Sequence, residues 1–217
     1  MAPLAIDLFA GLGGWTEGLL AEGFNVVGFD IERHVYGEAR YPAQLVIQDV
    51  LTIHGTQFKD AALIVASPPC TEFSYMAMPW SRAKEKAAAL RDGRDDPKRL
   101  TALFDACFRI QAEACEAAGH HVPLVVENVC GAQKWVGRAK WKYGSFALWG
   151  DVPALMPIRR RGDGVKQGGD WFNASQPSIS RLTSSKSTAR KAASAHIAKI
   201  PPSLSRWIAR AWKPDGA

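Results

Sequence analysis

The sequence predicts an α/β fold built on an open, doubly wound and mostly parallel sheet, and three observations predict it. Over about the first 150 residues, short apolar runs alternate with longer segments of helical periodicity. A glycine-rich turn separates the first apolar run from the first helical segment. Side chains suited to chemistry, such as Asp30, Asp49, Cys70 and Glu127, follow directly after apolar runs. Because ligands bind at the carboxyl ends of parallel strands, we expect one site at that edge.

Five short apolar runs are the expected strands. The first ends at the glycine turn, the second and third end at Asp30 and Asp49, the fourth ends at two prolines, and the fifth ends before Glu127. Each run has the length of a buried strand and is bounded by turn-forming or polar residues. The expected strands cover residues 3–9, 25–29, 45–48, 61–66 and 123–126.

Three segments are expected to be helices, at residues 15–22, 100–118 and 203–212. Gly23 ends the first, and Pro201 with Pro202 opens the third. In the second, Leu103, Cys107 and Ile110 recur on one face, which is typical of a helix that packs on a sheet. Between residues 159 and 196, turn signals and small, polar, basic residues replace this pattern and indicate a small irregular insertion.

Composition limits the class of protein. With 217 residues, 47% of them hydrophobic, the chain can bury one sizeable core. The net charge of +6 suits a polyanionic partner, although many basic proteins bind no nucleic acid. The four cysteines form no CxxC pair and have no histidine cluster, so a zinc site is not expected. The chain shows neither a signal-peptide pattern nor a run of 18 apolar residues, so we expect a cytoplasmic protein with reduced thiols and no membrane partner.

The first motif is Asp-Leu-Phe-Ala-Gly-Leu-Gly-Gly at residues 7–14, where a strand runs through a glycine turn into a helix. Glycines allow positive φ and a close approach of ligand to backbone, and the helix N-terminus offers free N–H groups. Asp30 ends the next strand, where an acidic residue commonly holds ribose hydroxyls. A tight turn with a surface aspartate is the alternative. The turn fits GxGxxG poorly, so a nicotinamide cofactor is less favoured.

The second motif is Ser-Pro-Pro-Cys-Thr-Glu-Phe-Ser at residues 67–74, after the fourth strand. Two prolines restrict the backbone and present Cys70 on a stiff loop. Such a cysteine is either a small apolar filler or a nucleophile. Glu127, at the end of the next strand, favours the nucleophile, because a carboxyl group near a thiol allows acid catalysis alongside covalent attack.

Taken in order, these two motifs and the triplet Glu127-Asn128-Val129 resemble the DNA cytosine-5 methyltransferase family. The resemblance covers roughly residues 4–150 and, less closely, the last helix. It implies the Rossmann-like fold of S-adenosylmethionine-dependent methyltransferases. It also implies the activity of a DNA (cytosine-5-)-methyltransferase, which transfers a methyl group from S-adenosylmethionine to a cytosine flipped out of double-stranded DNA and leaves S-adenosylhomocysteine.

The resemblance implies a role for individual residues. Cys70 would attack C6 of the cytosine, and Glu127 would hydrogen-bond N3 and the exocyclic amine. Asp30 would bind the cofactor ribose, with Ile31 against the adenine face and Asp49 at the adenine amino group. The implied cofactor contacts are Phe9, Ala10, Gly11, Gly13, Gly14, Asp30, Ile31, Asp49 and Pro68, the implied substrate contacts are Pro69, Ser74 and Asn128, and the implied catalytic residues are Cys70, Glu127, Arg159 and Arg161.

The sequence departs from the family at its C-terminal side. The family's Gly-Asn pair before the last helix is absent, since residues 196–202 read His-Ile-Ala-Lys-Ile-Pro-Pro, and cofactor contacts from this end stay open. Only residues 162–196 are available for target recognition. We therefore expect a short or loose recognition sequence, or a partner that supplies specificity, in a compact, phage-like enzyme.

Two basic segments have competing interpretations. The family's Arg-x-Arg element matches Arg159 and Arg161, but Arg138 with Lys140 is a competing match, and a solvated basic turn is a third interpretation. Residues 75–100 are rich in charge. In the family this region closes over DNA, where Trp80 and Arg82 would fill the space left by the extruded base, and a solvated helix is the alternative.

The expected organisation is a catalytic S-adenosylmethionine-binding domain at 1–158, a reduced target-recognition segment at 159–196 and a C-terminal helix at 197–217 that returns to the catalytic domain. The chain is expected to act as a monomer on double-stranded DNA in a bacterial host, in restriction–modification or in protection of phage DNA. Three alternatives stay open: an RNA cytosine-5 methyltransferase, a non-catalytic nucleic-acid-binding relative, and an unrelated dinucleotide enzyme.

Overall fold

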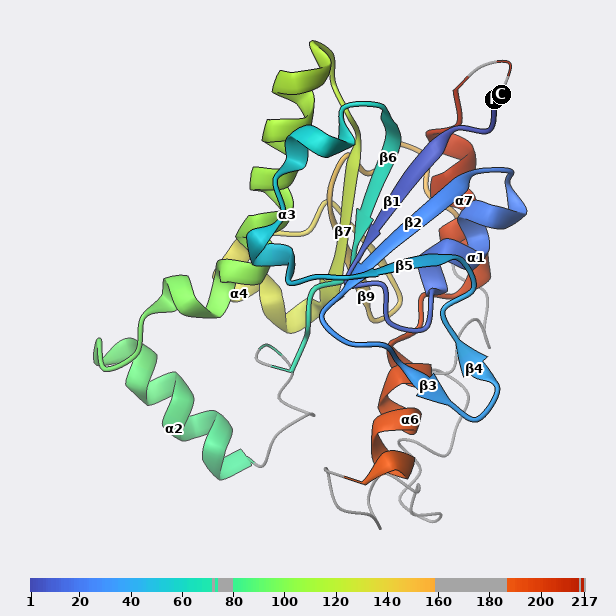
Figure 1. Ribbon diagram of the computed structural model, residues 1–217. Helices are drawn as coiled ribbons and strands as arrows, with labels where there is room; N and C mark the ends of the chain where they lie inside the picture. Colours follow the sequence, from blue (N-terminus) through green and yellow to red (C-terminus); the bar gives the residue numbers. More distant parts are fainter. Residues whose placement is uncertain (72, 74–79, 159–186, 215, 217) are drawn as a thin grey trace.

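The computed structural model describes residues 1–71, 73, 80–158, 187–214 and 216, and in that part of the chain the central element is a seven-stranded sheet (Figure 1). The strand order is β5-β2-β1-β6-β7-β9-β8. A separate two-stranded ribbon pairs β3 with β4. The strands are β1 (Leu4–Leu8), β2 (Asn25–Asp30), β3 (Val35–Tyr36), β4 (Ala39–Arg40), β5 (Gln44–Ile47), β6 (Ala61–Ala66), β7 (Leu124–Val129), β8 (Trp141–Tyr143) and β9 (Phe146–Gly150).

Five neighbouring strands of the sheet are parallel, namely β5, β2, β1, β6 and β7. β9 runs antiparallel to β7, and β8 runs antiparallel to β9. From β1 the chain builds outward in one direction through β2 and β5, and later in the other direction through β6 and β7. The switch point therefore lies between β1 and β6, where open α/β sheets bind their ligands. The predicted doubly wound, mostly parallel, Rossmann-like methyltransferase fold is confirmed.

Helices cover both faces of the sheet (Figure 1). One face carries α1 (Gly14–Ala21) and α7 (Pro202–Ala211), and the other carries α3 (Pro97–Ala118). Alternation along the strands explains the two layers, because successive strand residues point to opposite faces. In β6, Leu63 and Val65 pack with the α1 and α7 side, and Ile64 packs with the α3 side. The remaining helices are α2 (Trp80–Arg91), α4 (Gln133–Val136) and α6 (Thr188–Ala198), with the 3-10 turns η1 (Val50–Thr52), η2 (Gly55–Phe58) and η3 (Cys130–Ala132).

The C-terminal helix α7 lies against the N-terminal helix α1. Gly18 permits this contact, since a Cβ at that position would collide with the Ser205 hydroxyl. Glu22 at the end of α1 accepts a hydrogen bond from Arg206 Nε at 2.6 Å, and its other oxygen lies 2.9 Å from Arg210 Nε. The chain thus returns, after its last strand, to the layer formed by its first helix.

Three elements differ from the sequence-based expectation. Glu127 lies inside β7 rather than after it, because β9 pairs with β7 as far as Val129. Helix α3 begins at Pro97 rather than at residue 100, because the Asp96 side chain accepts a hydrogen bond from Lys98 N at 2.9 Å and caps the helix. Residues 188–198, in a region expected to be irregular, form α6, and Ser187 caps that helix.

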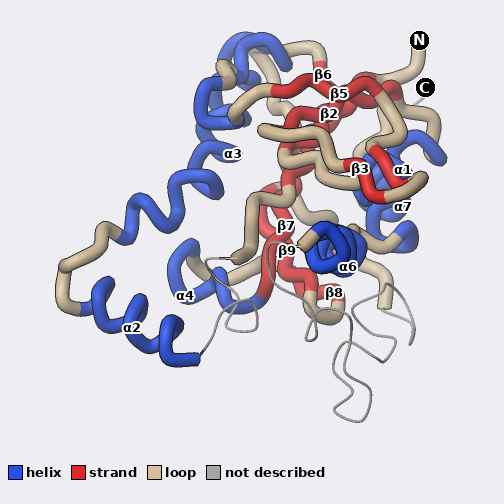
Figure 2. The backbone as a smooth tube through the Cα atoms, turned by 60° about the horizontal axis from the view of Figure 1, so that its bottom comes forward, coloured by secondary structure: helices blue, strands red, loops and turns tan. Residues whose placement is uncertain are grey.

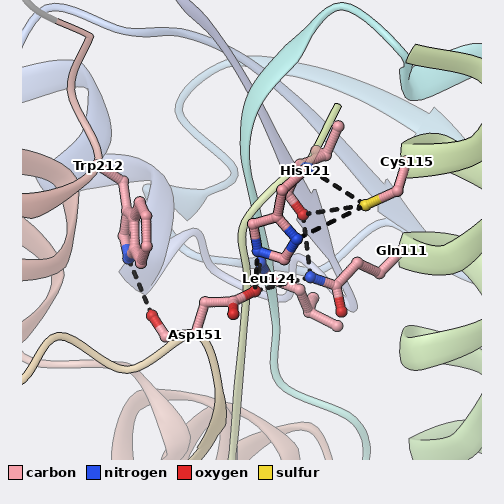
Figure 3. Close-up of polar contacts among 7 residues, drawn as sticks. Gln111, Cys115, His121, Leu124, Asp151 and Trp212 are labelled. Atoms are coloured by element: carbon pink, nitrogen blue, oxygen red, sulfur yellow. Dashed lines mark hydrogen bonds and ion pairs between the residues drawn. The ribbon is translucent and has the colours of Figure 1, made fainter. Parts of the chain in front are cut away.

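A polar cluster around Asp151 joins three elements at the start of β7 (Figure 3). Asp151 Oδ2 accepts hydrogen bonds from Gln111 Nε2 at 2.7 Å and from Leu124 N at 2.9 Å. His121 Nε2 lies 3.1 Å from the same oxygen, and the Asp151 carbonyl accepts a hydrogen bond from Trp212 Nε1. These contacts tie α3, β7 and the C-terminal segment together at the edge opposite the carboxyl ends of the strands.

The carboxyl edge of the parallel strands is where α2 and α6 extend beyond the body of the protein (Figure 1; Figure 2). No acidic residue occurs in α6, and α2 contains several basic residues with a single glutamate. In the described ranges, no helix combines the length and the apolar character needed to cross a membrane.

Candidate active site

A cavity of about 360 Å³ lies at the carboxyl ends of four neighbouring strands, β5, β2, β1 and β6. The turn after β1, the end of β2 and the residues that follow β5 and β6 line it. One residue of α3, two residues of α6 and the two residues that follow α6 complete the wall. The volume falls in the range of small-molecule sites. The cavity therefore occupies the switch point, where the sequence predicted a ligand.

The glycine turn after β1 has the left-handed backbone that its composition predicts. Gly11 and Gly13 have φ values of 52° and 75°. In the described residues, Phe9 is the only non-glycine with positive φ, at 60°, a conformation usually held only where the surroundings require it. Phe9, Ala10 and Gly11 line the cavity. The unusual backbone thus forms the cavity wall itself.

Gly14 begins α1 and also lines the cavity. A Cβ on Gly14 would collide with the backbone nitrogen of Ile200 and would lie 2.9 Å from Cγ of Lys199. The segment between α6 and α7 therefore presses against the glycine turn. Lys199 and Ile200 of this segment line the cavity, together with Ala195 and Ala198 of α6.

Asp30, the last residue of β2, holds the glycine turn in place. Its Oδ2 accepts a hydrogen bond from Gly11 N at 2.8 Å, and its Oδ1 accepts one from Glu32 N at 3.3 Å. His34 Nε2 lies 3.6 Å from Oδ1. Burial raises the pKa of Asp30, but hydrogen bonds from His34 and from the two backbone N–H groups outweigh it and lower the pKa overall. The charged carboxylate keeps acceptor capacity for hydroxyl groups of a ligand.

Ile31 and Asp49 extend the cavity wall along the ends of β2 and β5. Ile31 is 68% exposed, so an apolar side chain faces open space in the cavity. Asp49 Oδ1 accepts a hydrogen bond from Leu51 N at 2.9 Å, which fixes the carboxylate at the start of η1. An apolar face beside a fixed acceptor suits a flat heterocycle that carries an amino group.

A buried chain of hydroxyl and carboxyl groups lies behind the glycine turn. Asp7 Oδ2 accepts a hydrogen bond from the Thr16 hydroxyl at 2.6 Å, and Tyr41 Oη lies 2.6 Å from the same hydroxyl. Burial, together with the nearby charge of Asp30, outweighs these hydrogen bonds and raises the pKa of Asp7 to about 7. Asp7 also lines the cavity. From the sequence, Asp7 stands at the start of the first motif without an assigned role, because its partners Thr16 and Tyr41 come from two later segments.

The loop that carries Cys70 is fastened on both sides. Before Cys70, Ser67 Oγ accepts a hydrogen bond from Trp15 Nε1 at 2.9 Å. After it, Phe73 N donates a hydrogen bond to the Cys70 carbonyl at 3.1 Å, and the Phe73 ring is buried in the core. Cys70 itself is partly exposed. Ser67 and Pro69 line the cavity, so the loop joins the thiol to the cavity wall.

Glu127 and Asn128 lie on β7, beside β6 in the sheet. The register pairs Ala66 with Val126, so Glu127 stands level with the start of the Cys70 loop. Glu127 is 6% exposed. Asn128 Nδ2 donates a hydrogen bond to the Pro68 carbonyl at 2.9 Å, and Asn128 Oδ1 accepts one from Val129 N. The asparagine therefore connects the strand that carries the carboxyl group to the loop that carries the thiol.

Some sequence-predicted residues are not in the cavity wall. Gly13 is left-handed and packs against Pro42, and the Pro68 carbonyl is engaged by Asn128, so neither lines the cavity. Arg138 and Lys140, the competing Arg-x-Arg match, are exposed before β8. Ser74, Arg159 and Arg161 lie outside the described residues, as do the side chains of Trp80 and Arg82. Conversely, the sequence did not single out His34 or Lys199.

Solved structures that resemble the chain are distant. A putative DNA modification methyltransferase encoded within a prophage of E. coli has a TM-score of 0.40 and 23% identity, over 60% of this chain and 33% of that one. The Dnmt2 methyltransferase of S. pombe has a TM-score of 0.38 and 15% identity, over 63% and 37%. A NAD-dependent NDP-hexosamine 5,6-dehydratase, TunA, also reaches 0.38, with 19% identity, over 64% and 41%. At such low TM-scores and sequence identities, the structural similarities do not discriminate among activities.

The chain therefore spans about a third of the length of the prophage methyltransferase and somewhat more of the other two. No curated protein matches it. Residues 4–110, which hold the glycine turn, Asp30, Asp49 and Cys70, match the family model described as C-5 cytosine-specific DNA methylase. Over these residues, just under half of the chain, it is similar to the C-5 cytosine-specific DNA methylase family.

Proposed function

We propose that this chain transfers a methyl group from S-adenosylmethionine to C5 of cytosine in DNA, through a covalent bond between Cys70 and C6. The match of residues 4–110 to the C-5 cytosine-specific DNA methylase model supports cytosine as the target and DNA as the substrate. The observation that carries the proposal is the Cys70 loop, which lines a cofactor-sized cavity and is joined by Asn128 to the strand of Glu127.

The volume of the cavity and the groups that line it support S-adenosylmethionine as its ligand. The Asp30 carboxylate, held by Gly11, would accept hydrogen bonds from the ribose hydroxyls. Ile31 would lie against the adenine ring, and Asp49 would meet its amino group. The backbone at Gly11, with φ of 52°, would let the cofactor approach the main chain. When bound, the cofactor supplies an electrophilic methyl group on a sulfonium.

Cys70 and Glu127 would act on the cytosine. C5 of cytosine is a weak nucleophile. Addition of the Cys70 thiolate at C6 uses the C5–C6 double bond, removes the aromaticity of the ring and makes C5 enamine-like. Glu127, hydrogen-bonded to N3 and the exocyclic amine, would steady the charge that moves into the ring. C5 then takes the methyl group, a base removes the C5 proton, and the Sγ–C6 bond breaks as the ring double bond re-forms.

The target cytosine must leave the duplex stack to reach Cys70, at a cost of a few kcal/mol. The net charge of +6 favours a polyanionic substrate, and basic residues in α2 and α6 extend from the edge of the sheet where Cys70 lies. The expected monomer, the short recognition sequence and a partner for specificity stay predictions, as do the roles of Ser74, Arg159 and Arg161.

The proposal is tested by incubating the chain with tritiated methyl donor and either duplex DNA or RNA. We expect label in DNA, at cytosine C5, and no label with Cys70→Ser. Cys115→Ser is the matched control, because that thiol is also partly exposed but lies at the opposite edge of the sheet. Label in RNA alone would replace the DNA substrate with RNA, and label that persists in Cys70→Ser would overturn the covalent route.

A further inference from the structure

Lys199 and Glu17 form an ion pair at the rim of the cavity. Lys199 Nζ lies 2.5 Å from Glu17 Oε1, and the lysine side chain is 28% exposed. Glu17 belongs to the first turn of α1, and Lys199 follows α6, so 182 residues separate them in the sequence. Lys199 lines the cavity. The pair therefore connects the end of the chain to the helix that follows the glycine turn.

The backbone at Lys199 is held from both sides. Its N–H donates a hydrogen bond to the His196 carbonyl at 3.3 Å, which ends α6. The next residue, Ile200, is 3% exposed and packs in the core with α1 and α7. A side chain at position 14 would collide with the backbone of Ile200. Close packing therefore sets the position of Lys199 relative to the glycine turn.

The charges around the cavity are unequal. Its described wall contains four carboxyl side chains, and Lys199 is the only lysine or arginine in it. The acidic residues Asp30, Glu32 and Asp49 lie at or after the ends of β2 and β5, whereas Lys199 lies against the turn after β1. A ligand that fits this distribution carries hydroxyl and amino donors in one part and a carboxylate in another.

We propose that Lys199 binds the carboxylate of the amino-acid part of S-adenosylmethionine and that Glu17 is a positioning residue, which holds the lysine ammonium at the glycine turn. This inference rests on the proposed function. Lys199 would then supply, from the segment between α6 and α7, a cofactor contact in place of the family's absent Gly-Asn pair. An ammonium held by one carboxylate keeps two further N–H donors for a second.

The experiment compares two ligands by calorimetry on the full chain. S-adenosylhomocysteine carries the amino-acid carboxylate, and 5′-methylthioadenosine has the same nucleoside without it. With Lys199→Met, which keeps much of the apolar stem, we expect affinity for S-adenosylhomocysteine to fall about tenfold or more, as for a lost hydrogen bond to a charged group. Affinity for methylthioadenosine should not change, and Lys199→Arg should restore most of the loss.

Two further variants sharpen the result. Glu17→Gln should weaken S-adenosylhomocysteine binding less than Lys199→Met does, again without an effect on methylthioadenosine. Arg206→Met removes a basic partner of Glu22, which caps the C-terminal end of α1 outside the cavity, and should leave both affinities unchanged. Equal loss of both ligands in Lys199→Met, or loss of neither, overturns the role of Lys199. If the unaltered chain binds neither ligand, the proposed function fails, and this inference fails with it.

Discussion

The side-chain amide of Asn128 donates a hydrogen bond to the carbonyl of Pro68 across two neighbouring parallel strands, at 2.9 Å. Asn128 is 1% exposed, and its amide oxygen is also used, by Val129 N. One side chain thus fixes where the Cys70 loop starts relative to the strand that carries Glu127. The geometry of thiol and carboxyl group depends on this contact.

Asn128→Ala should therefore impair catalysis beyond its effect on stability. Loss of two buried hydrogen bonds should lower the free energy of unfolding by about 1–3 kcal/mol. The rate of methyl transfer should fall by a larger factor than the folded fraction, because the loop that presents Cys70 loses its anchor. Gln111→Ala is the matched control, since that amide also bridges two segments, but at the Asp151 cluster. Equal losses of activity in the two variants at equal stability would contradict this role of Asn128.

The ion pair between Asp30 and His34 should be visible in a histidine titration. The hydrogen bond that the His34 ring donates to the Asp30 carboxylate is the main reason that the pKa of His34 lies above its ordinary value of 6.5. The stability that His34 contributes is thus present below pH 6.5 and is lost as the pH rises through the folded pKa. Asp30, whose pKa is lowered, contributes stability that is present above pH 3.8. This stability is lost as the pH falls through the pKa of Asp30 in the folded state.

We expect NMR to show a His34 midpoint above 6.5 in the unaltered chain and a clear fall of that midpoint in Asp30→Asn. Glu32→Gln is the control, because Glu32 Oε1 lies farther from the ring, at 3.9 Å, and should change the midpoint less. A His34 midpoint that does not move in Asp30→Asn would show that the pair does not form in solution.

Asp7 should make the protein less stable as the pH rises. Its pKa of about 7 in the fold, against 3.8 ordinarily, means that the native state binds more protons than the unfolded state between these values. Stability from this group therefore falls with pH, by up to about 1.4 kcal/mol per pH unit. In Asp7→Asn, urea unfolding should show that this slope has disappeared, whereas Asp105→Asn, on the exposed side of α3, should keep it. An unchanged slope in Asp7→Asn contradicts the raised pKa.

Gly14→Ala should separate cofactor binding from packing. A Cβ at Gly14 or at Gly18 collides with the C-terminal segment, so each substitution to alanine should destabilise the fold by about 1–3 kcal/mol. Gly14 lines the cavity and Gly18 does not, so only Gly14→Ala should also weaken S-adenosylhomocysteine binding. Similar affinity losses in both variants, measured well below their unfolding temperatures, would argue against the site.

The local sequence was sufficient to predict those strands and helices whose ends are set by their own residues. β6 coincides with the predicted strand, because its apolar run ends at Ser67 and two prolines. The start of α3 is also encoded locally, by Asp96 as a cap and Pro97 in the first turn. The glycine turn, Asp30 and Asp49 reach one cavity because parallel topology brings strand ends together.

The features that the sequence did not predict depend on contacts between segments that lie far apart in the chain. β7 continues through Glu127 because β9 pairs with it, and no feature of β7 itself indicates that partner. Lys199 reaches the cavity because α7 packs on α1, a contact that requires Gly18 and Ser205 to meet. His34 was missed because its importance comes from one carboxylate oxygen of Asp30 rather than from a motif.

The most direct test of the account is covalent trapping on duplex DNA that carries 5-fluorocytosine. Fluorine at C5 blocks release, so the bond from sulfur to C6 should persist after methyl transfer and appear in mass spectrometry on the peptide that contains Cys70. The account predicts this adduct in the unaltered chain and in Cys115→Ser, and none in Cys70→Ser. An adduct of equal yield in Cys70→Ser, or none from a chain that methylates ordinary DNA, would contradict it.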